Sequence, residues 1–500
     1  MYDIIYRSDY SINMDIHKVS TQPLGALAGE IIDCRCRRSH IMSTGQILFG
    51  AGVSAGIGSS MEGIVPRGSK VIVLTEKALY EDIARGILKR LERAGFRSEV
   101  RCFLSPPKTV EECEQITTNY KEDILSVYVD KHPYNQTVED VASYEIENSK
   151  LDDSEESSGG FPEDARIVLG IGGGSVIDAA KYVASTRGLP CYIVATSPAL
   201  IGCLTPSVML VKEGFIEVLK VTPPVAVLCD TDFFDAIESG DTPYNHASAS
   251  LGEIAGVLTA LFDWRVSGLI TNEFFCPYLA ETATDCIDLI LERLSGGRIV
   301  LTHDILTQTA ECSLRLSAIA QMTGNSRLVC GGETHLTHAY LMLFRRQKRI
   351  RRLYGEYIGM ASISVLELYA EELKHNVKKG FMPPPDNNIR MDKIAGYFGV
   401  PWLRAGDKIS PVYHKETLDI SVYKLTEFRD ELLSQAANSL KKAEQLRRNA
   451  RRTYNDFGYS LNNHITKPDA DKCIALAPDI REKFTLLTQL KNMGLLERFL

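Results

Sequence analysis

A glycine-rich segment carries the clearest chemical signal in this sequence. Residues 170–174 read Gly-Ile-Gly-Gly-Gly and follow an apolar run at 166–169 that is typical of a buried parallel strand. Ser175 then opens a stretch with helical periodicity. A strand, a glycine turn and a helix start in direct succession leave free amide groups, and the positive end of the helix dipole, at the turn. We therefore predict a nucleotide phosphate site, with a plain strand-to-helix turn as the alternative. The residues of the predicted site are Gly172, Gly173, Gly174 and Ser175, with Asp178 and Lys181 near its mouth.

Two further positions suggest metal chemistry. Glu253 is a carboxylate at the start of an otherwise apolar helical run, and His335 and His338 share one face of a second helix at i, i+3 spacing. Paired imidazoles and a carboxylate from another helix commonly seat a divalent metal that polarises an alcohol or carbonyl oxygen. The alternative is a hydrogen-bonded histidine pair, with Glu253 favouring its helix N-terminus through the dipole.

A third group of possible ligands lies near the N-terminus. Cys34, Cys36 and His40 have types and spacing that can hold a metal. A structural zinc usually has four ligands, and no fourth is apparent nearby in the sequence.

Composition limits the function classes. Five hundred residues with 44% hydrophobic and 24% charged content suffice for two domains of about 200 to 250 residues each. The net charge of −8 and a pI near 5.8 argue against nucleic acid as the main partner. The first 20 residues hold no apolar core of signal-peptide length, and no apolar run of about 18 residues occurs, so we expect a cytoplasmic protein without a membrane span. The 12 cysteines then indicate reduced thiols rather than a disulfide framework.

The expected elements change in type along the chain. The N-terminal part predicts strands at 46–52, 70–75, 98–103, 166–169, 190–195 and 225–229, a helix at 80–94 and a hairpin at 207–221. Amphipathic runs then predict helices at 254–271, 277–294, 304–322, 333–352, 358–374, 422–457 and 479–499. The fold class is therefore α/β followed by all-α: a Rossmann-like domain over 1–240, with an exposed, mobile acidic insertion at about 150–162, and a helical domain over 241–500. A ligand cleft between the two is expected.

Several of these motifs, in this order, resemble the superfamily of iron-containing alcohol dehydrogenases, glycerol dehydrogenases and dehydroquinate synthases, and most closely its sn-glycerol-1-phosphate dehydrogenases. The similarity extends over most of the chain and includes 34–40, 170–181, 259–265, 322–338 and 480–487. It implies NAD or NADP in the cleft, zinc or a similar divalent ion below the nicotinamide, and hydride transfer to a small phosphorylated ketone such as dihydroxyacetone phosphate. The choice between NAD and NADP, and any homo-oligomer, stay open.

The resemblance assigns the site residue by residue. The phosphate loop matches at 172–175, and Thr196 and Thr205 complete the predicted cofactor site. Glu253 matches the first metal ligand. His335, chosen over Thr334, matches the second, and Tyr354 stands where the family has a third, histidine ligand. His338 is the predicted proton relay and Arg327 the predicted phosphate contact. The basic run at 345–352 is interpreted as a solvated helix face, with attraction of a phosphorylated substrate or an acidic partner as the alternative.

Two departures from the family pattern support a second hypothesis. Tyr354 is a poorer metal ligand than histidine, and Ile201 replaces an aspartate that binds substrate hydroxyls. Together they suggest a nucleotide-binding relative with altered or lost catalysis. A synthase-type cyclase or lyase is a third hypothesis, although Gly256 stands where that branch has a lysine.

Overall fold

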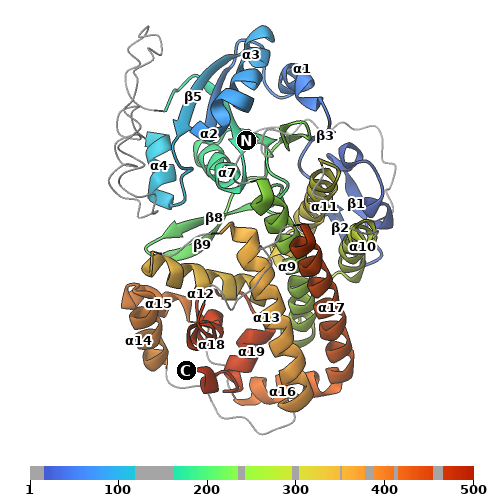
Figure 1. Cartoon of the computed structure of the whole chain (residues 1–500), viewed down its shortest axis with the longest axis vertical. Helices are drawn as coiled ribbons and strands as arrows, with labels where there is room; N and C mark the ends of the chain where they lie inside the picture. The colour runs from blue at the N-terminus through green and yellow to red at the C-terminus, as the bar shows by residue number, and fades with distance from the viewer. Residues whose placement is uncertain are drawn as a thin grey trace.

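The computed structural model describes residues 16–118, 161–234, 243–295, 303–348, 352–377, 387–409, 415–453 and 465–500. An α/β part and a part built mainly of helices lie at opposite ends of the molecule (Figure 1), which confirms the predicted fold class. The predicted domain boundary near residue 240 and nearly all of the predicted insertion at 150–162 lie outside the described residues.

A six-stranded parallel sheet forms the centre of the α/β part. Its order is β3-β10-β7-β6-β4-β5, and every neighbouring pair is parallel. The strands are β3 (Gln46–Gly50), β4 (Lys70–Glu76), β5 (Arg97–Phe103), β6 (Ala165–Gly172), β7 (Cys191–Ala195) and β10 (Ala226–Asp230). All residues of β7 and β10 are buried, as expected for central strands covered on both faces.

Helices cover both faces of this sheet. Leu91 and Ile87 of α3 (Arg85–Arg93) pack on one face together with Ile57 of α1 (Ile57–Glu62). The predicted helix at 80–94 begins as a π-helical turn, Tyr80–Ala84, before α3. Helix α7 (Gly174–Arg187) packs on β6 and β7, with α4 (Val110–Thr118) beside it, and their buried side chains continue into the core of the helical part.

The helical part is arranged around α9 (Pro243–Thr271). This helix packs against α13 (Tyr354–His375) and α17 (Arg429–Thr453). At the crossing with α13, a Cβ on Gly256 would lie 2.4 Å from the Ile358 side chain, so only glycine allows this approach. The other helices are α10 (Pro277–Leu294), α11 (His303–Met322), α12 (Gly332–Arg346), α14 (Asn387–Phe398), α15 (Trp402–Lys408), α16 (Lys415–Glu427), α18 (Lys467–Leu476) and α19 (Leu486–Asn492). Residues 246–271 are long and apolar enough to cross a membrane by length and composition, but 72% of their most apolar window is buried inside the fold, as in a core helix.

The C-terminal segment differs from the single helix predicted at 479–499. It forms α19 between two short 3-10 turns, Ala477–Asp479 and Glu497–Phe499. The carboxylate of Asp263 accepts hydrogen bonds from the amide of Leu486 at 2.7 Å and from the amide of Gly332 at 2.6 Å. One buried side chain of α9 thus stabilises the N-termini of both α12 and α19, which fixes where α19 begins.

Two hairpins lie outside the main sheet. The predicted hairpin at 207–221 is confirmed as β8 (Ser207–Lys212) and β9 (Phe215–Lys220), which lie between the sheet and the helical part (Figure 1). A second hairpin, β1 (Ile31–Asp33) with β2 (Ser39–Ile41), lies beside α10 and α11.

Candidate active site

A cavity of about 360 Å³ lies where the carboxyl end of the sheet faces the helical part. The α/β part lines it with the glycine loop, and the helical part lines it with carboxyl, phenol and guanidinium groups. The predicted site residues on its wall are Gly173, Gly174, Ser175, Asp178, Thr205, Glu253 and Tyr354. The structure therefore brings the predicted phosphate loop and the predicted first metal ligand to one cavity.

The glycine loop forms because β6 continues to Gly172 and α7 begins two residues later. A Cβ on Gly172 would lie 2.7 Å from the Val176 side chain, so a larger residue would push the helix away from the strand. Gly173 precedes the first turn and contributes no side-chain cap, and the first helical bond runs from the amide of Ile177 to the carbonyl of Gly173 at 3.0 Å. The backbone amides before Ile177 therefore have no acceptor within the helix, and they lie at the end of α7 that borders the cavity. Free amides at a helix N-terminus are an arrangement that binds anions.

Two charged residues of α7 connect the loop with the β8–β9 hairpin. Asp178 accepts a hydrogen bond from the amide of Met209 at 3.1 Å, and burial raises the pKa of its carboxyl to about 6. Lys181 is fully buried and donates to the carbonyls of Gly202 at 2.9 Å and Ser207 at 2.8 Å. Lys181 thus lies behind the loop rather than near its mouth, because its ammonium holds the hairpin against α7.

The two predicted cofactor threonines have different surroundings. Thr205 lines the cavity and donates to the carbonyl of Gly202 at 2.8 Å. Thr196 is buried outside the lining, and its amide donates to the carbonyl of Gly172 at 3.2 Å. Thr196 therefore supports the loop from behind, whereas Thr205 faces the cavity.

Glu253 reaches the cavity from α9 and contacts the α/β part. Its Oε2 accepts a hydrogen bond from the amide of Ile201 at 3.4 Å, and burial raises the pKa of this carboxyl to about 7. Ile201 also lines the cavity, so an apolar side chain occupies the position where the resemblance expects an aspartate.

The two predicted helix-face histidines lie outside the lining of the cavity. Both are buried on α12, and neither ring nitrogen of His335 has a hydrogen-bond partner within the described part of the chain. His338 Nε2 lies 3.4 Å from the phenol oxygen of Tyr354, which in turn donates to the sulfur of Met209 at 3.3 Å. His338 thus reaches the cavity through Tyr354, whereas His335 does not reach it.

Arg327, the predicted phosphate contact, lies outside the cavity lining, whereas Arg481, for which the sequence analysis predicts no role, lines it. Arg327 is buried and donates to Ser267 at 3.0 Å, to Glu273 and to the carbonyl of Phe484, so its guanidinium is engaged away from the cavity. Arg481 lines the cavity and forms no hydrogen bond or ion pair with the other described residues. In the sequence analysis, Arg481 is only one residue of the segment 480–487 that resembles the family. Its role was missed because its orientation depends on the short turns that replace the predicted C-terminal helix. Of the basic run at 345–352, Arg352 is bound to Glu356 and Arg346 to carbonyls of α14.

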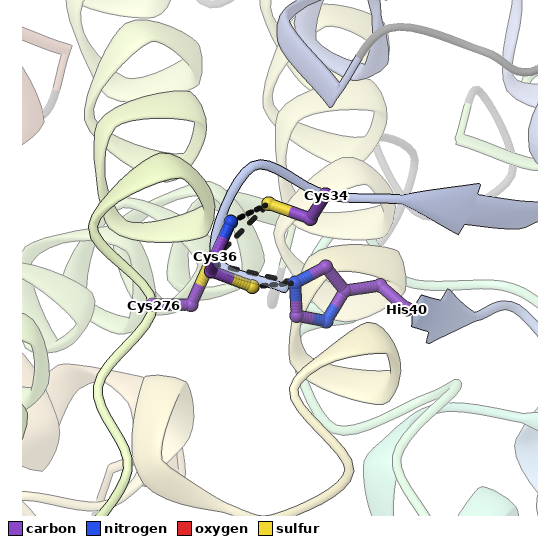
Figure 2. Close-up of side chains that lie close together, drawn as sticks. All are labelled: Cys34, Cys36, His40 and Cys276. Carbon is purple, nitrogen blue, oxygen red and sulfur yellow. Dashed lines mark hydrogen bonds between the residues drawn. The ribbon is translucent and has the colours of Figure 1, made fainter. Parts of the chain in front are cut away.

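A cysteine and histidine cluster lies outside this cavity. Cys34, Cys36 and His40 converge with Cys276, the residue that precedes α10 (Figure 2). The ligand atoms of the four residues all lie within 4.8 Å of one another. The fourth member was missed because it is 236 residues from His40 in the chain, and no local pattern connects them.

Comparisons with known proteins agree with this architecture. Residues 135–236 match the family described as iron-containing alcohol dehydrogenase. A glycerol-1-phosphate dehydrogenase [NAD(P)+] of Bacillus licheniformis is 26% identical over 210 residues, 42% of this chain and 51% of that protein. One of Sulfurisphaera tokodaii is 25% identical over 310 residues, 55% of this chain and 82% of that protein. The predicted superfamily resemblance is confirmed.

A solved structure supports the fold. An archaeal halo-thermophilic alcohol dehydrogenase from a Red Sea brine pool has a TM-score of 0.52 at 13% identity, covering 93% of this chain and 100% of its own. The chain spans about half the length of the first curated relatives it matches, 51% and 53%. The name of these relatives includes NAD(P)+, and the description of the matching family includes iron, which together support NAD(P) and a metal as cofactors of the superfamily. Among the described residues of this chain, one cluster has metal-binding donors.

Proposed function

We propose that the protein is an NAD(P)-dependent oxidoreductase that interconverts a small phosphorylated ketone, such as dihydroxyacetone phosphate, and its alcohol. The observation that carries the proposal is the shared cavity, in which the glycine loop at Gly173 faces Glu253, Tyr354 and Arg481. A ligand in this cavity contacts both an anion-binding helix terminus and groups able to donate a proton or bind a phosphate. The relatives named glycerol-1-phosphate dehydrogenase support the substrate class.

The loop residues fit a dinucleotide. A Cβ on Gly174, at the start of α7, would meet no heavy atom within 4 Å, so the space beside the first helical turn is open. Free amides and the helix dipole at that turn suit a diphosphate. When bound, NAD(P)H supplies the hydride that a ketone reduction needs.

The predicted metal ligands Glu253, His335 and Tyr354 do not fit a divalent ion in this arrangement. His335 lies outside the cavity lining. Burial raises the pKa of Tyr354 well above its ordinary value, so the phenol keeps its proton and is a poor ligand. Among the residues that the structure describes, one group of Cys, His, Asp or Glu side chains has its ligand atoms close enough to share a metal ion. It consists of Cys34, Cys36, His40 and Cys276, and it lies outside the cavity.

Tyr354 and Arg481 are the chain's own groups for the reaction. A protonated phenol on the cavity wall can donate its proton to the carbonyl oxygen as hydride reaches the carbonyl carbon. His338, whose Nε2 lies 3.4 Å from the phenol oxygen, is the group that we propose to relay a proton back to the phenol. Arg481 supplies a cation for the substrate phosphate, because its guanidinium has no other partner among the described residues.

The oxidation of NADH or NADPH in the presence of dihydroxyacetone phosphate tests this proposal. We expect steady-state turnover that falls in the Tyr354→Phe variant by about 100-fold, the usual range for loss of a general acid. The nucleotide affinity of that variant is expected to stay unchanged, because the phenol is not part of the glycine loop. No consumption of either nucleotide by the wild-type protein would overturn the proposed reaction.

A second candidate is a nucleotide-binding protein without turnover. It is favoured by Ile201, whose apolar side chain lines the cavity, and by the poor fit of the metal ligands. Saturable binding of NADH without its consumption by dihydroxyacetone phosphate or by other small ketones would support this candidate. The synthase-type alternative has no comparable support, since Ile358 fills the space that a lysine in place of Gly256 requires.

A further inference from the structure

We propose that Cys34, Cys36, His40 and Cys276 form a structural zinc site that ties the N-terminal β1–β2 hairpin to the start of α10. The site is separate from the candidate active site, and the proposal does not depend on nucleotide binding or turnover. The four residues of the proposed zinc site all lie outside the cavity lining.

The four side chains have the donor set and spacing of a tetrahedral zinc site. Cys34 Sγ lies 3.8 Å from Cys276 Sγ, and His40 Nε2 lies 3.4 Å from the sulfurs of both Cys36 and Cys276. With zinc–sulfur bonds of about 2.3 Å and zinc–nitrogen bonds of about 2.0 to 2.1 Å, a tetrahedron places its sulfurs about 3.8 Å apart and sulfur and nitrogen about 3.6 Å apart. These three separations are within about 0.2 Å of those expected for ligands around one central ion, and the other pairs of ligand atoms also lie within 4.8 Å of each other.

The backbone holds the three N-terminal donors in place. Cys34 and Cys36 lie in the turn between β1 and β2, and His40 lies on β2 opposite Ile32. Arg37 has a left-handed conformation with φ of 68°, uncommon for a residue other than glycine, which closes the turn. The amide of Cys36 also donates to Cys34 Sγ at 3.5 Å, a contact that stabilises a thiolate.

Helices α11 and α10 orient the imidazole of His40 and the thiol of Cys276, respectively. His40 Nδ1 lies 3.0 Å from the carbonyl of Met322 at the end of α11, so Nδ1 is the protonated nitrogen and Nε2 is left to bind a metal. Cys276 is the N-cap of α10, and its Sγ accepts a hydrogen bond from the amide of Leu279 at 3.4 Å. Figure 2 shows all four side chains directed toward one point, from the hairpin and from the segment that leads into α10.

The arrangement favours a closed structural site over the alternatives. Cys34, His40 and Cys276 are buried, and four protein ligands leave no open position for a substrate. A sulfur separation of 3.8 Å is much longer than the roughly 2.05 Å of a disulfide, so the described cysteines are free thiols. Three thiolates also select zinc over magnesium or calcium, which prefer oxygen ligands.

The first test is metal analysis of the purified full-length protein. We expect one zinc ion per chain, with an X-ray absorption spectrum that fits three sulfurs and one nitrogen. Cobalt exchanged into the same protein is expected to show the intense visible bands and the sulfur-to-metal charge transfer of tetrahedral thiolate coordination. Because both spectra use the wild-type chain, they do not depend on the folding of a variant. Purified protein without bound zinc and unable to take up zinc or cobalt would overturn the proposal.

Matched variants then assign the ion to these residues. Cys276→Ser and His40→Ala are expected to lose the zinc, whereas His40→Cys, which restores a fourth ligand, should retain it. Cys473→Ser, a buried cysteine of α18 outside the cluster, is the control for the loss of a thiol and should also retain one zinc per chain. Glu253→Gln should likewise leave the zinc content unchanged. If zinc persists in Cys276→Ser and is lost in Glu253→Gln, the ion belongs to the cavity and the proposed structural site is wrong.

Discussion

Glu253 Oε2 accepts a hydrogen bond from the amide of Ile201 at 3.4 Å. This contact joins α9 of the helical part to the loop that follows β7, across the wall of the candidate active site. It also places an apolar side chain beside a buried carboxyl group, where the resemblance expects a second carboxylate. The two departures from the family pattern therefore meet in one cavity, because Tyr354 lines it as well.

Restoring an aspartate at Ile201 is expected to destabilise the protein. Ile201 is only 5% exposed, and a second carboxylate beside Glu253 would leave two like charges in a buried site. We expect Ile201→Asp to lower the free energy of unfolding by about 3 kcal/mol, and by more at about pH 8 than at about pH 5. Ile201→Asn, with the same shape and no charge, is the control for chemical denaturation at both pH values. Equal losses for the two variants would show that charge is not the cause.

Two glycines of the phosphate loop are expected to respond differently to alanine. A Cβ on Gly172 meets Val176 at 2.7 Å, so Gly172→Ala should lower the melting temperature. A Cβ on Gly174 meets nothing within 4 Å and enters open space at the cavity wall. Gly174→Ala should therefore fold normally but bind NADH about tenfold more weakly, a loss of ~1.4 kcal/mol. Thermal melts and nucleotide titrations of both variants check this, and unchanged NADH affinity in Gly174→Ala would place the nucleotide elsewhere.

Nucleotide affinity is expected to fall as the pH rises through about 6. Burial raises the pKa of Asp178 to about 6, so its carboxyl is neutral below this pH and negative above it. The ionised form repels a diphosphate at the neighbouring loop, which should weaken NAD+ binding by about threefold to tenfold. Calorimetric titrations from about pH 5 to pH 8 measure this change, since the diphosphate of NAD+ stays ionised throughout. Asp178→Asn should bind NAD+ with the same affinity across the range; an equally steep profile in that variant would assign the change to another group.

Substitutions of Arg481 and Arg327 are expected to have different effects, the first on substrate binding and the second on stability. Arg481→Gln removes a cavity cation without other partners among the described residues, so KM for dihydroxyacetone phosphate should rise about 10-fold to 100-fold. The affinity for NADH and the melting temperature should stay unchanged. Arg327→Gln instead leaves Glu273 without its ion-pair partner and should lower the melting temperature. A raised KM in Arg327→Gln at unchanged stability would restore Arg327 as the phosphate contact.

Local patterns were sufficient to predict most elements but not the contacts between distant ones. The strand at 70–75, the hairpin at 207–221 and the helix at 277–294 were predicted almost to the residue, because each has a continuous hydrophobic period between clear end signals. The helix predicted at 479–499 is broken, because Asp263 on α9 binds the amide of Leu486. That interaction spans 223 residues and leaves no periodic trace in the sequence.

The same limit applies to the candidate site. The glycine loop could be predicted because strand, turn and helix are consecutive. Glu253 could be placed beside it by resemblance. The sequence does not determine whether Arg327 or Arg481 faces the cavity, since this depends on which partner satisfies each guanidinium. It also does not pair Cys276 with Cys34, because the two lie on elements that approach only in the folded chain.

The most direct test of the central claim is a fluorescence titration of the full-length protein with NADH and NADPH, followed by dihydroxyacetone phosphate in the same sample. We predict saturable nucleotide binding that Gly174→Ala weakens, and then loss of the nucleotide signal as the ketone is reduced. A wild-type protein that binds neither NADH nor NADPH would contradict the account, because the glycine loop and the cavity it lines would then have no nucleotide to hold.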